Sequence, residues 1–426
     1  MDRKQLFPIL LIIFTNILGA GVIIPILPLY AEGEFQGSVF QITLLSSVFF
    51  GAQFLAAPVL GRLSDRHGRR PILILSQMGT VLAFILFILA GPLGQQIDKL
   101  RLGLPITGGM VMLFIARALD GITGGNITTA QAYVSDITDD INRTQGLGYL
   151  QAAFGAGFIF GPAFGGVLSR FGVVAPFIGA TIITAGTLTL TIFTLKESLP
   201  PEEREISGVP KKLRTREKVK IFSVPALPII LVIGFVASLA FSALPAIFSL
   251  YADDVIFQQA AQAGAYIGLM LAFNGMFQVI TQISLLRPLI QKFGERRVLV
   301  IGQIALIIGF FGIAVLTDAI LVTVLFAPFA FGRGLSEPSI QSLVTRFQSV
   351  AKSGTLLGFY QSARSLALIL GPIWAGYAYE AISPQAVFIV GGIIMILALV
   401  FSLILLGMEI PGKKPASSPV PSRPSE

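Results

Sequence analysis

Twelve apolar stretches of membrane-spanning length dominate this chain of 426 residues. A helix needs about 20 consecutive apolar residues to cross the hydrocarbon core of a bilayer. The stretches, read between clusters of charged and turn-forming residues, lie at 7–30, 38–61, 71–91, 106–134, 144–168, 172–195, 225–251, 262–286, 297–317, 319–343, 355–380 and 384–408. The first stretch is longer than the apolar core of a signal peptide, so we retain it as a span. The sequence therefore predicts an all-α membrane protein with twelve transmembrane helices.

The composition argues against several other classes of protein. Hydrophobic residues make up 54% of the chain and charged residues 12%, about half the charged share of a soluble globular protein. The chain has no cysteine and one histidine, His67, so we expect no metal site and no Ser-His-Asp triad. We find no nucleotide-binding glycine motif in a plausible context. We therefore expect a protein that is not an enzyme, needs no cofactor and draws its energy from a proton gradient.

The basic residues are unevenly distributed between the two sides of the membrane. Of the 30 Lys and Arg residues, 24 lie in the terminal segments and loops of one side, and three lie within spans. The other side carries Lys99, Arg101 and Arg170. Because loops rich in Lys and Arg stay in the cytoplasm, we expect both termini there and the protein in the inner (cytoplasmic) membrane. The net charge of +8 then reflects orientation in a lipid bilayer rather than binding to nucleic acid.

A single long charged connection divides the chain into two parts. Residues 196–224 separate six spans from six. We therefore predict a six-helix bundle at 1–195, a cytoplasmic linker at 196–224 and a second six-helix bundle at 225–410. The Pro- and Ser-rich tail at 411–426 is expected to be disordered.

The two halves repeat each other weakly and in the same direction. The repeat is carried by Gly148, Gln151, Gly161, Pro162 and Gly166, which recur 210 residues later as Gly358, Gln361, Gly371, Pro372 and Gly376. Parallel repeats are found in transporters whose substrate site lies between two bundles. We therefore predict two pseudo-symmetric bundles related by an axis along the membrane normal.

Three segments carry motifs with fixed spacing. The loop after the second predicted span has the pattern G-x-x-x-D-R-x-G-R-R, formed by Gly61, Asp65, Arg66, Gly68, Arg69 and Arg70. The fifth span has the pattern G-x-x-x-G-P-x-x-G-G, formed by Gly157, Gly161, Pro162, Gly165 and Gly166. Small residues four positions apart let helices approach closely. The fourth span has Arg117 followed four residues later by Gly121, and it ends near Asp136 and Arg143.

These motifs resemble those of the major facilitator superfamily, and the chain is most similar to its twelve-span drug:proton antiporter branch, which includes tetracycline-efflux-like proteins. The resemblance implies that the 61–70 loop is a latch between the halves, with Asp65 against the eleventh span. It implies that the motif of the fifth span favours export and that Arg117 takes part in proton coupling. Asp136 is then a candidate partner for the arginines of the loop. The chain departs from tetracycline exporters at Asn16, where they carry an acidic residue.

Charged side chains inside the predicted spans are the candidate proton-coupling residues, because burying a charge in a membrane is costly. Asp120 lies three residues after Arg117, and Glu337 lies four residues after Arg333, so each acid and base can pair on one helix. Either the pairs neutralise each other permanently, or an acid exchanges a proton while its arginine tunes it. Proton exchange is the favoured interpretation for Asp120, and both interpretations stay open for Glu337.

A set of polar and aromatic residues within the spans is predicted to line a substrate cavity. The set comprises Asn16, Gln53, Asn126, Gln151, Asn274, Gln278, Tyr360, Gln361, Arg364 and Trp374. Hydrogen bonding between helices is the alternative role for any one of them. Taken together they indicate a largely apolar site with a few polar anchors, which suits a lipophilic substrate.

These features predict a secondary active transporter, a monomer that exports amphipathic small molecules or drugs by alternating access in exchange for protons. A first alternative is proton-coupled uptake, or lipid-linked flipping, of a small organic substrate, with an anion held by Arg117, Arg333 and Arg364. A second alternative is a receptor that does not transport.

Overall fold

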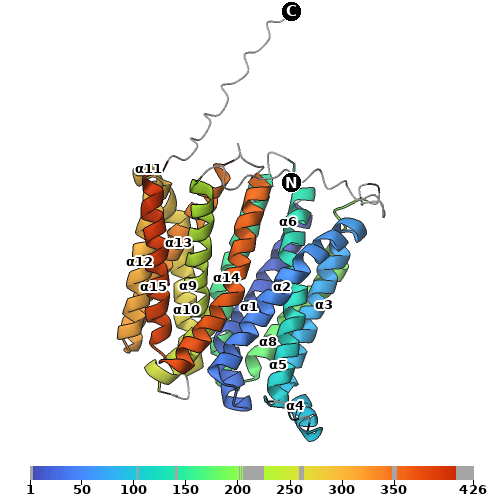
Figure 1. Ribbon diagram of the computed structural model, residues 1–426. Coiled ribbons are helices and arrows are strands. Elements are labelled where there is room, and N and C mark those ends of the chain that lie inside the picture. Colours follow the sequence, from blue (N-terminus) through green and yellow to red (C-terminus); the bar gives the residue numbers. More distant parts are fainter. Residues whose placement is uncertain are drawn as a thin grey trace, which may run out of the picture.

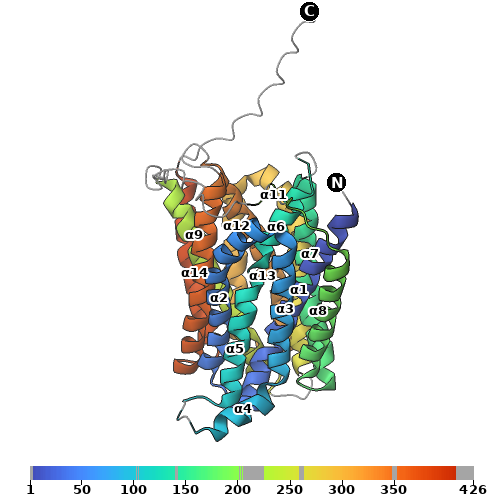
Figure 2. The ribbon, with the colours of Figure 1, turned by 90° about the vertical axis from the view of Figure 1, so that its right-hand side faces the viewer.

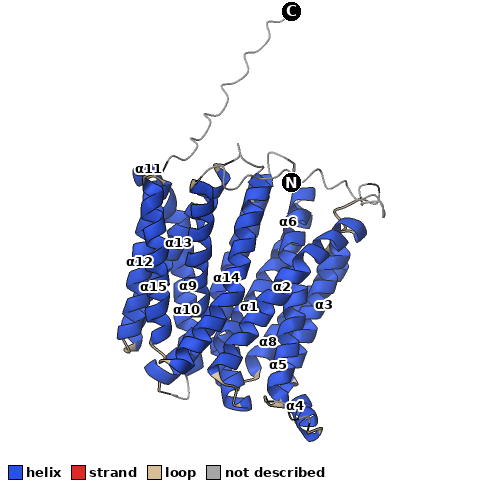
Figure 3. Cartoon of the chain, in the orientation of Figure 1, coloured by secondary structure: helices blue, strands red, loops and turns tan. Residues whose placement is uncertain are grey.

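The computed structural model describes residues 3–101, 103, 105–139, 143–200, 202, 204, 225–258, 263–347 and 353–408. Every regular element among these residues is a helix (Figure 3). The N-terminal half contains α1 (Arg3–Phe35), α2 (Val39–His67), α3 (Arg69–Ile88), α4 (Ala90–Lys99), α5 (Gly108–Thr123), α6 (Ile127–Asp136), α7 (Arg143–Leu168) and α8 (Ala175–Thr194). The C-terminal half contains α9 (Ala226–Tyr251), α10 (Ala263–Ile280), α11 (Leu286–Phe293), α12 (Glu295–Val315), α13 (Ala319–Thr345), α14 (Ser353–Ala381) and α15 (Ala386–Leu406).

The predicted spans are all helical. Eleven helical stretches within the described ranges are long and apolar enough to cross a membrane. The remaining predicted span, the eleventh, corresponds to α14, which is 29 residues long but is less apolar because it carries Arg364 and Glu380. The fourth span is broken into α5 and α6 by a 3-10 turn at Gly124–Asn126, and the eighth joins α10 to α11 through a π-helical turn at Thr281–Leu285. The sequence analysis predicted neither break, nor helix α4.

The two halves lie side by side, with the N-terminal half on the right in Figure 1 and towards the viewer in Figure 2. We name the two ends of the molecule by what they carry. The terminal face carries the turn at Gly68, between α2 and α3, and the end of α15. The α4 face, at the opposite end, carries α4 (Figure 1). The tail expected at 411–426 and residues 205–224 of the expected linker lie outside the described residues. The boundaries of the linker and of the tail therefore stay predictions.

The glycines of the sequence repeat make equivalent contacts inside each half. A Cβ atom placed on Gly161 of α7 falls 2.7 Å from the Cα of Gly21 on α1. The equivalent glycine of α14, Gly371, lies against Ser242 of α9. In both halves the conserved spacing therefore lets the fifth helix of the bundle cross the first at backbone distance.

A second glycine of the repeat makes equivalent contacts between the halves. A Cβ atom on Gly166 of α7 falls 3.0 Å from the Cα of Gly268 on α10. A Cβ atom on Gly376 of α14 falls 3.0 Å from the Cα of Phe40 on α2. Two close helix crossings thus join the halves, and both lie towards the α4 face, where α7 and α14 end.

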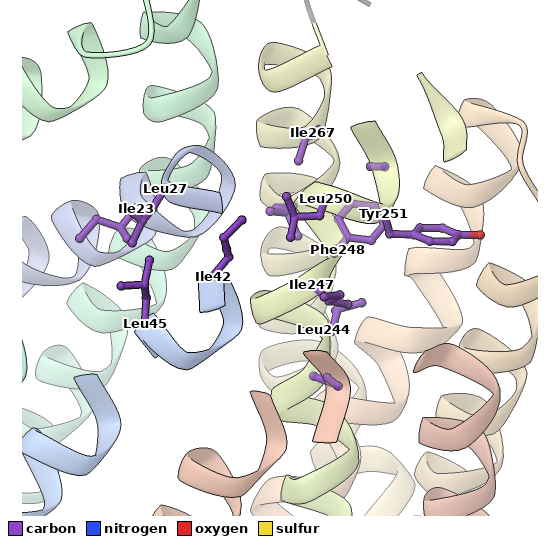
Figure 4. Close-up of a cluster of buried hydrophobic side chains, with 14 of the residues drawn as sticks. Ile23, Leu27, Ile42, Leu45, Leu244, Ile247, Phe248, Leu250, Tyr251 and Ile267 are labelled. Carbon is purple, nitrogen blue, oxygen red and sulfur yellow. The ribbon is translucent and has the colours of Figure 1, made fainter. Parts of the chain in front are cut away.

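The buried apolar side chains form three separate clusters. The largest one includes residues of α1 and α2 together with residues of α9 and α10, so both halves share it. Figure 4 shows this shared core, with Ile23, Leu27, Ile42 and Leu45 from the N-terminal half and Leu244, Ile247, Phe248, Leu250, Tyr251 and Ile267 from the C-terminal half. The other two clusters lie towards the terminal face. One is made only of N-terminal residues, such as Leu6 and Leu73, and the other only of C-terminal residues, such as Ile230 and Leu405.

Two hydrogen bonds between the halves lie towards the same end of the molecule as the shared core. The Ser47 hydroxyl of α2 donates to the Ile369 carbonyl of α14 at 2.8 Å. The Phe40 amide, in the first turn of α2, donates to the Glu380 carboxylate of α14 at 2.7 Å. Both bonds lie towards the α4 face, since α2 begins there and α14 ends there.

Towards the terminal face, polar side chains are exposed on α7 and α14, two helices that contact the other half. Gln151 of α7 and Gln361 of α14 are exposed at equivalent positions of the repeat. Such side chains are costly in contact with lipid, so their exposure indicates water between the halves. The structure is therefore closed at the α4 face and open at the terminal face.

The close crossing of α1 and α7 leads to a first prediction. Gly161→Leu forces a side chain against the Gly21 backbone and is expected to destabilise the protein by about 1–3 kcal/mol. Thermal unfolding of the purified protein in detergent measures this change. Gly186→Leu in α8 is the control, because no atom lies within 4 Å of a Cβ at that glycine; equal losses for both variants would contradict the proposed packing.

The open terminal face leads to a second prediction. Because the chain contains no cysteine, a single introduced cysteine reports whether water reaches its position. Gln361→Cys is expected to react with a water-soluble maleimide at least about tenfold faster than Thr43→Cys, since Thr43 is buried against Gly376 at the closed end. Both variants should react equally after denaturation. Equal rates in the native protein would show that the two ends are equally accessible.

Candidate functional site

The first acidic centre lies inside the N-terminal half. Arg117 and Asp120 are neighbours on one face of α5, and the guanidinium Nη1 lies 3.4 Å from the Asp120 Oδ2. Both side chains are less than one-tenth exposed. The guanidinium also lies over the ring of Phe49 from α2, 4.3 Å from the ring centre, in a cation–π contact. The structure confirms the predicted pair within one helix.

A small polar cavity adjoins Asp120. It has a volume of about 50 Å³ and is lined by Asn16, Ile17, Ala20, Phe49, Gln53, Thr80, Asp120, Gly124, Asn126 and Ile127. This volume has room for about one or two water molecules. Three residues that the sequence analysis assigned to the substrate cavity, Asn16, Gln53 and Asn126, therefore meet around Asp120. The buried amide nitrogen of Asn126 has no hydrogen-bond partner among the described residues, so it can donate to such a water.

The break between α5 and α6 shapes this cavity. The 3-10 turn spans Gly124–Asn126, and the Gln53 side chain of α2 donates to the Gly124 carbonyl at 2.9 Å. Gly121 allows the close approach of α2, because a Cβ there would lie 2.4 Å from the Phe49 carbonyl oxygen. Thr80 of α3 adds a hydrogen bond to Asp120. The sequence analysis missed Thr80 and Phe49, whose roles depend on contacts between helices.

The second acidic centre lies inside the C-terminal half. Glu337 Oε2 pairs with the Arg333 Nη2 at 2.9 Å, which confirms the second predicted pair. Glu337 Oε1 accepts hydrogen bonds from the Tyr360 hydroxyl at 2.6 Å and from the Gln341 amide at 3.0 Å. Arg364 Nε lies 3.6 Å from the same oxygen. Arg333 also lies over the Phe241 ring of α9, at 4.0 Å.

Each acid is therefore held by its own half. Among the described residues, the side-chain partners of Asp120 belong to α3 and α5, and those of Glu337 belong to α13 and α14. Asp120 faces a small cavity, whereas Glu337 faces a set of hydrogen-bond donors.

The remaining predicted cavity residues fall into different environments. Asn274 is buried, and its Oδ1 has no partner among the described residues, while Gln278 is half-buried on α10. Gln151 and Gln361 are exposed on the open side. The Trp374 indole donates to the Leu239 carbonyl of α9 at 3.2 Å, so this residue joins α14 to α9 and is not in either acidic centre.

The 61–70 motif binds together the terminal face of the N-terminal half. Gly68 forms the turn between α2 and α3 with a φ of +100°, a region that favours glycine. Arg69 pairs with Asp65 at 2.5 Å and with Asp136 of α6 at 3.1 Å. Arg70 donates to the Ile192 carbonyl near the end of α8 at 2.7 Å. The expected contact between the loop and Asp136 is confirmed.

The implied latch to the other half is not formed by the described residues in this conformation. Asp65 pairs with Arg69 rather than with α14, and nothing lies within 4 Å of a Cβ at Gly61. Arg66 is exposed. Arg143 begins α7, and its side chain lies outside the described part of the chain. This absence agrees with the separation of the halves at the terminal face, and the latch stays a prediction for the other conformation.

Glu197, in the predicted linker, belongs to the same network. Its carboxylate accepts hydrogen bonds from the Arg69 amide at 2.7 Å and from the Arg70 amide at 3.2 Å. A carboxylate at this position stabilises the start of α3, because it satisfies free amides and complements the helix dipole. The sequence analysis missed Glu197, since it is distant in sequence from the helix that it caps.

The C-terminal half contains the same network with its charges exchanged. The loop after α2 recurs 226 residues later, so that Gly294 matches Gly68 and Glu295 occupies the position of Arg69. Glu295 pairs with Arg346 at 2.9 Å. Arg296 occupies the position of Arg70 and donates to carbonyls at the end of α15, including that of Met408 at 2.6 Å. Each half thus has an arginine, Arg70 or Arg296, that caps its last helix. In each half the residue before this arginine forms a salt bridge.

The contact between Glu197 and α3 leads to a third prediction. Glu197→Ala leaves the first amides of α3 without their partner and is expected to cost about 1 kcal/mol. A lower midpoint of thermal unfolding measures this loss. Glu202→Ala removes an exposed carboxylate nearby in sequence and is expected to leave the midpoint unchanged. An unchanged midpoint for Glu197→Ala would refute the capping role.

Comparisons with known proteins identify the family. The profile of the Major Facilitator Superfamily matches residues 9–284 and 230–425. The tetracycline resistance protein, class C, of Escherichia coli is 28% identical over 89% of this chain and 91% of its own. Multidrug resistance protein 2 of Bacillus subtilis (strain 168) is 29% identical over 95% of this chain and 96% of its own.

A solved structure shows the same fold. The human organic anion transporter MFSD10 (TETRAN) matches with a TM-score of 0.65 and 22% identity, and the match covers 94% of this chain and 99% of that one. Together with the twelve helical spans and the paired half-bundles, these matches show that the chain is a multi-pass membrane protein that belongs to the Major Facilitator Superfamily.

Proposed function

We propose that this chain exports amphipathic small molecules, including drugs, in exchange for protons, and that it works by alternating access. The single observation that carries this proposal is the buried Asp120 beside a polar cavity within the membrane. The relatives that are named for resistance to tetracycline and to multiple drugs align with nearly the whole chain, which supports export and a lipophilic substrate. No cofactor enters this proposal, because the proton gradient supplies the energy.

Asp120 is the better candidate for proton exchange because its charge is held by few partners. Its carboxylate contacts Arg117 at 3.4 Å and Thr80, and the neighbouring cavity has room for water to carry a proton. A buried carboxylate that can reach water and has one base as partner can alternate between two protonation states. Loss of its charge releases Arg117, which remains positioned by the Phe49 ring.

Glu337 is assigned a different role. Three hydrogen bonds or salt bridges shorter than about 3.1 Å hold its two oxygens, and a second arginine lies nearby. These partners stabilise the charged carboxylate. In this proposal Glu337 stays ionised during the cycle and fixes the arginines around it.

The proposed cycle alternates between two arrangements of the halves. In the arrangement described here the terminal face is open, and substrate enters between α7, α10, α14 and α2. The halves then close at the terminal face and separate at the α4 face. This separation breaks the contacts of the shared apolar core and the two glycine crossings between the halves. A proton that reaches Asp120 from the α4 face favours the return. The excess of Lys and Arg supports a cytoplasmic terminal face, so this cycle moves substrate out of the cell.

A fourth prediction tests the proton step. Asp120→Asn keeps the shape of the side chain but cannot lose a proton. Substrate accumulation driven by a pH gradient, measured in everted vesicles with a fluorescent amphipathic zwitterion such as norfloxacin, is expected to fall at least about tenfold. Exchange of substrate between two equal concentrations should persist, because that reaction needs no net proton movement.

Asp318→Asn is the matched control. It makes the same chemical change at an exposed position, where Asp318 caps α13 by accepting from the Ile320 and Leu321 amides, and asparagine caps a helix equally well. This variant should accumulate substrate normally. Unchanged accumulation by Asp120→Asn would remove Asp120 from the coupling step, and accumulation only in the inward direction would replace export by uptake.

A further inference from the structure

The charges of the second acidic centre do not balance. Within the membrane, two arginines, Arg333 and Arg364, lie around one carboxylate, Glu337. The N-terminal centre, in contrast, has one arginine and one carboxylate. Since an uncompensated charge at this depth is costly, the second centre has capacity for one more negative charge.

The three intramembrane arginines differ in how fully they are paired. Arg117 and Arg333 each pair with an acid on their own helix and lie over an aromatic ring, and their side chains are less than one-tenth exposed. Arg364 lies 3.6 Å from Glu337, too far for a hydrogen bond. Its buried Nε has no hydrogen-bond partner among the described residues, and the same is true of the Arg117 Nε. The Glu337 oxygen that it faces is already used by Tyr360 and Gln341. Among the described residues, Arg364 is therefore the one of the three arginines that neither lies over an aromatic ring nor comes within 3.5 Å of a carboxylate oxygen.

Arg364 is also the arginine that water and solutes can reach. Its side chain is 29% exposed, against 8% for Arg333. The exposed Gln361 lies one helical turn closer to the terminal face, on the same side of α14. Ile369, which accepts the hydrogen bond from Ser47 of the other half, lies five residues further on, about 7.5 Å along the helix. Arg364 thus lies just inside the opening, next to the point where the halves close.

We infer that Arg364 binds the anionic group, a carboxylate or sulfonate, of an amphipathic substrate that enters from the terminal face. The planar guanidinium can donate two parallel hydrogen bonds to such a group, and the added negative charge balances the second arginine. Glu337 positions Arg333 and Tyr360 beside this site and does not itself contact the substrate. This inference rests on the proposed export function and narrows its substrates to amphipathic anions and zwitterions; it selects one of the three arginines considered from the sequence.

Binding of two matched probes tests the site without any proton gradient. Dansylglycine carries a carboxylate, and dansylglycinamide has the same fluorescent body with a neutral amide. Fluorescence titration of the purified chain in nanodiscs of zwitterionic lipid, with empty nanodiscs subtracted, gives the affinity for each. The unaltered protein is expected to bind dansylglycine about tenfold more tightly, and Arg364→Gln is expected to remove that preference while leaving the affinity for the amide unchanged. Arg364→Lys, which keeps the charge, should retain a preference for the carboxylate.

Two controls separate this site from other effects. Arg170→Gln removes an exposed positive charge at the α4 face and should keep the preference, whereas its loss would indicate a general effect of net charge and overturn the assignment. Equal binding of both probes by the unaltered protein, or an intact preference in Arg364→Gln, would also overturn it. The preference should persist in Asp120→Asn, so failure of the proton-coupling proposal and failure of the anion site give different results.

Discussion

The shared apolar core at the α4 face is the contact on which the observed arrangement depends. It joins α1 and α2 to α9 and α10, and it lies beside the two glycine crossings that bring Gly166 to Gly268 and Gly376 to Phe40. Towards the terminal face each half has its own core. Two rigid bundles that share a core at one end and have separate cores at the other can rock about the shared end. The water-exposed glutamines on α7 and α14 mark the side that is open.

The two bundles use intramembrane charge differently. In the N-terminal half one acid and one base lie beside a small polar cavity, an arrangement that suits a change of protonation. In the C-terminal half several donors hold Glu337, and a second arginine, Arg364, lies 3.6 Å from that carboxylate. Because a buried carboxylate needs compensation at all times, a group with many donors suits a permanent charge and a group with few donors suits an exchangeable one. The proposed roles thus divide proton handling and substrate recognition between the two pseudo-symmetric bundles.

The internal repeat conserves backbone geometry more strictly than charge. Gly161 and Gly371 serve the same helix crossing in both halves, and Arg70 and Arg296 both cap the last helix of their bundle. The neighbouring salt bridge, in contrast, has reversed signs, with Arg69 and Asp136 in one half and Glu295 and Arg346 in the other. A close crossing tolerates only a small residue, whereas a salt bridge works in either orientation, so the first is fixed and the second is free to exchange.

The sequence by itself determined the twelve helical spans, the pairing of two repeated halves and the two acid–base pairs within α5 and α13. These follow from local rules: the length of an apolar run fixes a span, and a spacing of three or four residues places two side chains on one helical face. Only the tertiary structure decided what lies around those pairs. Phe49, Thr80 and Asn126 meet at Asp120 because α2, α3 and α5 converge there, and Tyr360 reaches Glu337 from another helix. The breaks at Gly124–Asn126 and Thr281–Leu285, the cap from Glu197 and the unbalanced charge at Arg364 likewise arise from contacts between segments far apart in the chain, which hydropathy and spacing do not encode.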